Sequence, residues 1–484
     1  MKYSSIPFMS ATLLALAVLL FLFALNAYQL HESTEPRVAG IAAEVLIDND
    51  WVTPKLNGSA FLEKPPLSIW LDATSIKIFG AKPFAVRLAS ALAGISTVLI
   101  LFWQLVRLQK SPISAWLAGL LLITMAEFWS NVRLVGEDAL LTLGVTLCLL
   151  AFLQAQTRHS IGSWLLFAAG LAIATLSKGV FGLALPSAVI FAYLLSRTLI
   201  DKRFSIAQWL RPAAATLIGL IPLIIWLWFL YQSNGSSALT EVLWANSVGR
   251  FGGEFKNNGH FEPFYYYLTK LPQVFLPWNI LVFLGLWQLL KRAKHDHQAL
   301  FFSCWLLAPF ILLSLSSGKR MVYQLAMYPA AAVIAAEYCR HLMAFLKDTA
   351  ATSPLSLWLY RHHQAVMTGL LMLISMGYLY RAAIWEPKQD RTESLLPVTE
   401  QLTEMLDHGR HIVLYRPSER LAGAAVFYTG HTWPELDNVT ELKLFLDADA
   451  NNVAVASADT EVADNLRVLY QVQVGKRSYV FLAR

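Results

Sequence analysis

The stretch F-M-S-A-T-L-L-A-L-A-V-L-L-F-L-F-A-L-N-A-Y-Q-L, from Phe8 to Leu30, contains no charged residue and indicates the class of fold. A bilayer has a hydrocarbon core of about 30 Å, which takes about 20 apolar residues of helix to cross. This stretch is longer than the apolar part of a signal peptide, and no small-residue cleavage site precedes His31. We therefore expect it to stay in the protein as a signal anchor.

The composition of the whole chain agrees with a membrane protein. Of its 484 residues 56% are hydrophobic and only 14% are charged, whereas soluble domains carry about 25% charged residues. This deficit argues against a disordered chain, a disulfide scaffold and most soluble enzymes. The net charge of +6 is explained by Lys and Arg in cytoplasmic loops, so we expect no nucleic acid partner. The three cysteines lie in apolar runs and predict neither a disulfide nor a metal site.

Further apolar stretches follow along the chain, and with the first they predict about eleven membrane helices in an all-α polytopic bundle. They lie near residues 88–106, 113–129, 138–156, 162–177, 180–196, 210–231, 272–290, 299–316, 322–339 and 366–384.

Three polar regions do not fit this bundle, namely residues 31–87, 232–271 and 385–484. Lys and Arg concentrate in the even-numbered short connections, which predicts a cytoplasmic N-terminus and places all three regions on the outer face. The last region alternates short β-rich runs, among them His411–Tyr415, with helix-like segments, which is typical of a small α/β domain. We therefore predict a membrane domain over residues 1–384 and a C-terminal domain over 385–484 that packs against the outer loops.

The first outer loop contains D-N-D-W-V-T-P-K-L-N-G-S-A-F-L-E-K-P-P-L-S-I-W, from Asp48 to Trp70. Its spaced aromatic residues are typical of an anchor at the lipid headgroups, and we predict interfacial helices in this loop. An anchor does not require the adjacent acid and base Glu63 and Lys64 in a proline-stiffened turn. A fixed acid and base at the lipid surface are suited to binding an anionic headgroup, through Lys64, and to accepting a proton, through Glu63.

Other charges lie at the predicted outer ends of helices. Glu137 and Asp138 begin one apolar stretch, where helix capping is the simple alternative, and Lys178 ends another, where the alternative is a lysine that extends toward the interface. Phosphate recognition favours cations beside a hydroxyl group, and Lys319, Arg320 and Tyr323 meet that description. Arg250 and His260 flank a Gly-rich loop that is suited to closing over a ligand.

Taken in order, these motifs resemble the GT-C class of integral-membrane glycosyltransferases, in particular the bacterial aminoarabinose transferases and protein mannosyltransferase relatives that use polyprenyl-phosphate sugars. The resemblance covers most of residues 1–345. Its most specific part is W-V-T-P-K-L-N-G-S-A-F-L-E-K-P-P-L at 51–67. The supporting parts are T-E-P-R at 34–37, R-L-V-G-E-D at 133–138, L-S-K-G at 176–179, H-F-E-P-F-Y-Y-Y at 260–267, L-P-W at 276–278 and S-S-G-K-R-M-V-Y at 316–323.

The sequence departs from the family at two places. The family usually begins its first loop with Asp-Glu, and the Asp is its favoured catalytic carboxylate, whereas this chain has Thr34-Glu35. Three alternatives follow. Glu35 or Asp138 takes the role of the base, or the acceptor needs little deprotonation, or the chain has lost ordinary activity. Some relatives bind a metal with the motif Glu and a His before the Arg of the second loop. That His is missing from W-A-N-S-V-G-R at 244–250, so we predict no metal.

The resemblance implies that a sugar is transferred, with inversion, from a polyprenyl (undecaprenyl) phosphate to lipid A or another surface acceptor on the periplasmic face of the bacterial inner membrane. We predict that Lys64, Arg250, Lys319, Arg320 and Tyr323 bind the donor phosphate. Supporting roles are expected for Arg37, Glu63, Lys178 and His260. No cofactor is required, and the protein is expected to be a monomer among membrane lipids. The alternatives are a protein O-glycosyltransferase, a lipid or glycan transporter, and a catalytically idle partner protein.

Overall fold

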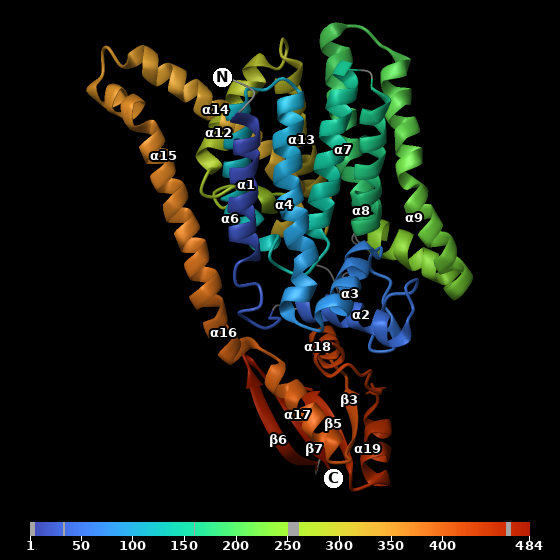
Figure 1. The fold of residues 1–484 in the computed structure, drawn as a ribbon. Coiled ribbons are helices and arrows are strands. Elements are labelled where there is room, and N and C mark those ends of the chain that lie inside the picture. Colours follow the sequence, from blue (N-terminus) through green and yellow to red (C-terminus); the bar gives the residue numbers. More distant parts are fainter. Residues whose placement is uncertain (1–4, 32–33, 159, 250–260, 461–465) are drawn as a thin grey trace.

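The structure is a computed structural model that describes residues 5–31, 34–158, 160–249, 261–460 and 466–484. A bundle of helices forms its larger part, and a small α/β domain lies beyond one end of the bundle (Figure 1). The long helices are α1 (Ile6–Leu22), α4 (Pro83–Arg107), α5 (Pro112–Ile123), α7 (Asp138–Arg158), α8 (Ile161–Asp201), α9 (Ile206–Thr240), α12 (Asn279–Arg292), α13 (His297–Leu315), α14 (Tyr328–Thr349) and α15 (Pro354–Tyr380). Short connecting elements are α6 (Ala126–Asn131), η2 (Glu241–Gly249), α11 (Tyr266–Lys270) and η3 (Met321–Met327).

The apolar helices confirm the prediction of a multi-pass membrane bundle. In the part of the chain that the structure describes, 6 helices are long and apolar enough to cross a membrane, and α1 and α5 are shorter apolar helices. One of the six is α8, which contains two of the predicted spans, 162–177 and 180–196. The number of eleven crossings stays a prediction.

Helix α8 reverses where its backbone leaves the helical conformation at Lys178 and Gly179. Gly179 has a φ of 52°, which glycine adopts without the steric cost that a side chain would bring. On either side of this turn the chain approaches itself closely, because a Cβ on Gly182 would overlap the backbone of Ala174. The turn therefore places the Lys178 side chain at the end of the helical bundle.

The first outer loop folds into two helices and a small hairpin beside the bundle. They are α2 (Thr34–Asp48), β1 (Lys55–Leu56), β2 (Ser59–Ala60) and α3 (Leu67–Phe79). Asn57 and Gly58 turn the hairpin with φ values of 51° and 87°, a combination that two-residue hairpin turns favour. The predicted helices of the first outer loop are thus present.

The C-terminal domain contains a five-stranded sheet with the order β4-β3-β5-β7-β6. β3 pairs in parallel with β4 and β5, whereas β7 is antiparallel to both β5 and β6. The strands are β3 (His411–Tyr415), β4 (Glu435–Leu436), β5 (Asn452–Ser457), β6 (Arg467–Val474) and β7 (Arg477–Ala483), and the helices are α17 (Leu396–Asp407), α18 (Glu419–Thr429) and α19 (Val439–Ala448). The prediction of a small α/β domain is confirmed.

A continuous helical stretch leads from the bundle into this domain, through α15, η4 (Arg381–Trp385) and α16 (Glu386–Glu393). The predicted boundary at residues 384 and 385 falls within this stretch and stays a prediction. Contacts from the first outer loop hold the domain in place: Arg37 donates to Glu419 over 2.7 Å, and Asn57 exchanges two hydrogen bonds with the backbone of Trp433.

Candidate active site

Two lysines and two carboxylates converge where three segments meet at the end of the bundle. Lys64 follows the hairpin of the first outer loop, Glu137 and Asp138 lie at the start of α7, and Lys178 lies at the turn of α8. Glu137 accepts a hydrogen bond from Lys64 and lies 3.4 Å from the Nζ of Lys178. Lys178 also donates to Asp138. These four residues form what we call the acid–lysine cluster.

The electrostatics of this cluster keep Glu137 ionised. Only 4% of its side chain is exposed, and this burial alone would raise its pKa, but Lys64 and Lys178 outweigh burial and hold the pKa well below its usual range. Lys64 is 25% exposed at its side chain. Its ammonium group is therefore reachable for a ligand while it is positioned by Glu137.

The cluster borders a cavity of about 60 Å³, which we call the cluster cavity. Lys64, Glu137 and Asp138 line it together with Arg320 and Thr34. Among the described residues, no carboxylate pairs with the Arg320 guanidinium. With Glu35, which also lines the cavity, two cations and three carboxylates face one space, which is an arrangement suited to an anionic ligand next to a proton acceptor.

Tyr323 and Lys319 come from the same segment as Arg320 but are placed differently. The Nζ of Lys178 lies 4.4 Å from the centre of the Tyr323 ring, so Tyr323 belongs to the surroundings of the cluster. Lys319 is buried and its ammonium group donates to the backbone carbonyls of Glu262 and Ser316. This geometry favours a role for Lys319 in holding its loop, and phosphate binding by Lys319 stays a prediction.

Glu35 is bound on both of its oxygens by Arg87. The Nε and Nη2 of Arg87 each lie 2.8 Å from a carboxylate oxygen, and the N–H of Val135 donates over 3.0 Å. Burial alone would raise the pKa of Glu35, but Arg87 holds the pKa below its usual value. Its role as a base stays a prediction, although this geometry favours a structural anion.

Some of the remaining predicted residues lie near the contact between the first outer loop and the C-terminal domain, and the others lie outside the described residues. Arg37 lies between Glu419 of α18 and Glu63, at 2.7 and 3.7 Å, so Arg37 links Glu63 of the first outer loop to the C-terminal domain. Arg250 and His260 lie outside the described residues. Within the described ranges, no group of three or more His, Cys, Asp or Glu is arranged to hold a metal ion.

Sequence reasoning missed Arg87 and treated Glu137 only as an acid at a helix end. Arg87 carries no local signal, because its partner Glu35 is 52 residues away. Glu137 does carry one, since it adjoins Asp138 within the motif R-L-V-G-E-D. For Lys178, the alternative of a lysine extending to the interface is replaced by its ion pair with Asp138.

Comparisons with known proteins agree with this architecture. The family described as "Dolichyl-phosphate-mannose-protein mannosyltransferase" matches residues 63–226. An undecaprenyl phosphate-alpha-4-amino-4-deoxy-L-arabinose arabinosyl transferase of Proteus mirabilis is 28% identical over 334 residues, which are 68% of this chain and 59% of that protein. The chain thus spans less than two thirds of this relative's length. An uncharacterized protein of Aquifex aeolicus is 26% identical over 434 residues, with 86% and 84% of the two chains covered.

The crystal structure of ArnT from Cupriavidus metallidurans bound to undecaprenyl phosphate has the same fold. Its TM-score to this chain is 0.75 with 20% sequence identity, and 97% of each chain is covered. The fold is therefore that of the GT-C class of integral-membrane glycosyltransferases, as predicted. Within this class the chain is similar in sequence to the aminoarabinose transferases, and it is a multi-pass protein of the bacterial inner membrane.

Proposed function

We propose that this protein transfers a sugar from an undecaprenyl-phosphate donor to lipid A, or another surface glycolipid or glycan, on the periplasmic side of the membrane. The observation that carries the proposal is the convergence of Lys64, Arg320, Glu137 and Asp138 on the cluster cavity at the end of an apolar bundle. The lipid chain of the donor would lie along the apolar helices. We further propose that a single copy of the chain is sufficient.

The cations of the cluster cavity suit the leaving group of this reaction. When the bond between the anomeric carbon and the phosphate oxygen breaks, both bonding electrons stay with that oxygen, and the polyprenyl phosphate departs as an anion. Lys64 and Arg320 are placed to stabilise the negative charge that develops there. Because Glu137 holds Lys64 in position before the reaction, little reorganisation of this lysine is needed when the charge appears.

The carboxylates of the cavity suit the acceptor. Asp138, whose side chain is 17% exposed, is placed to orient the acceptor oxygen and to take its proton as that oxygen bonds to the anomeric carbon. Attack from the face opposite the phosphate inverts the configuration of the sugar in a single displacement. An acceptor oxygen that is already ionised would need only orientation, which agrees with Thr34 in place of the family carboxylate.

The known relatives support the class of donor. The Proteus mirabilis relative is named for an undecaprenyl-phosphate aminoarabinose, and the ArnT of similar fold was crystallised with undecaprenyl phosphate. Sequence identities of 28% and 20% leave the sugar open. The match of residues 63–226 to a protein mannosyltransferase family makes a secreted protein the second candidate acceptor.

Mass spectrometry of lipid A, surface glycans and envelope proteins from a deletion strain tests the proposal. We expect one sugar to disappear from one of these fractions, to return with the wild-type gene, and to stay absent with Lys64→Ala. The control is Lys291→Ala, because Lys291 lies over Trp287 on α12, away from the cavity. Loss from envelope proteins alone would favour the second candidate. Full complementation by Lys64→Ala would contradict the phosphate site, and unchanged glycans in the deletion strain would contradict transfer.

A further inference from the structure

The segment 28–31, which leads from α1 toward the first outer loop, is bound along its backbone by the C-terminal part of the chain. Asp390 of α16 accepts the N–H of Gln29 on both of its oxygens, at 2.9 and 2.8 Å. The hydroxyl of Tyr428 in α18 accepts the N–H of Leu30 at 3.1 Å. Two elements that lie about 360 and 400 positions later in the chain therefore fix this segment.

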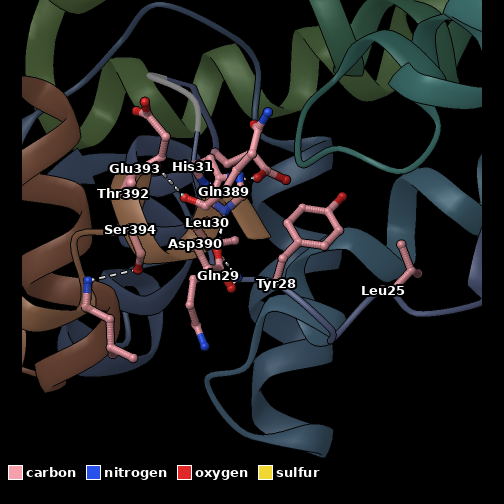
Figure 2. Close-up of polar contacts among 12 residues, drawn as sticks. Leu25, Tyr28, Gln29, Leu30, His31, Gln389, Asp390, Thr392, Glu393 and Ser394 are labelled. Atoms are coloured by element: carbon pink, nitrogen blue, oxygen red, sulfur yellow. Dashed lines mark hydrogen bonds and ion pairs between the residues drawn. The ribbon is translucent and has the colours of Figure 1, made fainter. Parts of the chain in front are cut away.

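His31 adds a side-chain contact to the same carboxylate. Its ring Nε2 is hydrogen-bonded to Oδ1 of Asp390, as Figure 2 shows. The side chains of the pair are 13% and 21% exposed, and His31 borders a cavity of about 200 Å³, so protons reach its ring. A neutral histidine offers one N–H, whereas a protonated one offers two and carries a charge. The contact is thus a hydrogen bond when His31 is neutral and an ion pair when it is protonated.

The other groups that face His31 do not share this property. Its ring lies 5.2 Å from the ring of Tyr28. The charged residues that line the cavity beside it are Glu35, Glu386, Glu393, Arg133, Arg381 and Arg420. Of the side-chain types around the cavity, only histidine ordinarily changes its charge between pH 5 and pH 8. Two further contacts of the domain with the loop, Arg37 with Glu419 and Asn57 with Trp433, contain no histidine.

The segment 28–31 is connected directly to the cluster cavity. Thr34 and Glu35 begin α2 a few residues later, and both line that cavity. Arg87 donates to the carbonyls of residues 28 and 29 and also binds Glu35. Glu35 in turn accepts the N–H of Val135, in the loop that precedes α7. A change in the position of the segment therefore reaches two walls of the cluster cavity.

We propose that Asp390 is a positioning residue of the active site, and that His31 makes its contact a pH-dependent latch between α16 and the first outer loop. This inference rests on the proposed function, which places the contact in the periplasm. The latched state binds the proton of His31 more tightly than the open state does. Its stabilisation is therefore complete at low pH and is lost as the pH rises through the range in which histidine ordinarily titrates. Sugar transfer is favoured in acid surroundings.

Hydrogen exchange of the full-length protein in detergent tests the latch itself. After correction for the intrinsic effect of pH, we expect the Gln29 and Leu30 amides of the wild type to exchange about fivefold more slowly at pH 5.5 than at pH 7.5, because a charge-assisted hydrogen bond is stronger than a neutral one. His31→Gln keeps a neutral donor and should show no such difference. His408→Gln, at an exposed position after α17, is the control and should retain the wild-type difference.

The role in transfer is measured in the deletion strain, which carries each gene under one promoter and grows at pH 5.5 or pH 7.5. The quantity is the sugar that the deletion strain lacks. We expect the ratio of the amounts at the two pH values to be about threefold higher for the wild type and for His408→Gln than for His31→Gln, as the weaker hydrogen bond predicts. Asp390→Asn should lower the amount at both pH values and lose the wild-type ratio.

Each result decides one part of the inference. Equal exchange at the two pH values in the wild type, or the same pH difference in His31→Gln, would overturn the latch. Wild-type amounts of sugar with Asp390→Asn at both pH values would overturn its role as a positioning residue. If the deletion strain lacks no sugar while exchange depends on pH through His31, the latch stands and the proposed function fails.

Discussion

Gly40 of α2 and Gly423 of α18 cross so closely that a Cβ on Gly40 would lie 2.5 Å from the Cα of Gly423. One glycine belongs to the first outer loop and the other to the C-terminal domain. The loop segment that carries Lys64 therefore has the C-terminal domain packed directly against its first helix. A side chain at either glycine must separate the two.

Replacement of Gly423 by Val tests this contact. We expect a lower melting temperature in detergent and faster proteolysis between the domains, because the new side chain would overlap the backbone at Pro36 and Arg37. Sugar transfer should fall with it. Gly377→Ala is the control, since no atom lies within 4 Å of a Cβ there. A Gly423→Val protein with wild-type melting and proteolysis would show that the contact is dispensable.

Separate substitutions of Glu35 and Asp138 distinguish their roles. Glu35→Gln leaves the buried guanidinium of Arg87 without its counter-ion, and loss of one partner of a buried pair costs about 3–5 kcal/mol. We expect a clearly lower melting temperature in detergent.

Asp138→Asn should behave in the opposite way. Lys178 would keep Glu137 at 3.4 Å, so we expect a folded protein whose transfer rate falls by about 10² or more, as for loss of a proton acceptor. Transfer assays of purified protein, alongside melting curves, measure both effects. Full transfer by Asp138→Asn would exclude it as the base.

Glu137 predicts how stability depends on pH. Because Lys64 and Lys178 lower its pKa in the folded protein, its stabilisation is complete above the unfolded pKa of about 4.3. It is lost as the pH falls from there toward the lower folded pKa. We expect melting curves between pH 7 and pH 3 to fall more steeply below pH 5 for the wild type than for Glu137→Gln. Glu400→Gln, at an exposed position of α17, should retain the wild-type profile.

Asp72 in α3 predicts the reverse pH dependence. The residue is 2% exposed, one of its oxygens has no partner, and burial raises its pKa well above the usual value. The unfolded chain releases the proton at a lower pH than the folded protein does, so this group makes the protein less stable as the pH rises from its unfolded pKa to its folded pKa. Asp72→Asn should remove that decline, which melting curves at pH 4 to pH 8 would show. Parallel curves for the two proteins would contradict a protonated Asp72.

Membrane helices, outer-loop helices and the C-terminal strands could be predicted from the sequence because each depends on neighbouring residues. The apolar run at 138–156 corresponds to α7, and the β-rich run His411–Tyr415 coincides with β3. Hydrophobic length and strand propensity are local properties of a chain, and they are preserved wherever the segment lies in the fold. Asp138 was found in the same way, from its position at the start of a predicted helix, and Lys64 was found from the proline-stiffened turn of the first outer loop.

The pairing of those charges was decided by the tertiary structure alone. Lys64 binds Glu137 across 73 positions and Lys178 binds Asp138 across 40, and no local pattern records which helix ends meet. The same holds for Glu35. The sequence predicts it as a candidate base, but in the fold its carboxylate is hydrogen-bonded to Arg87. A buried charge must find an opposite charge because it has lost its water. The position of that partner follows from how the helices pack. The sequence by itself determined the fold class and the candidate charged residues. The packing of α2, α4, α7 and α8 decided which of these charged residues face the cluster cavity.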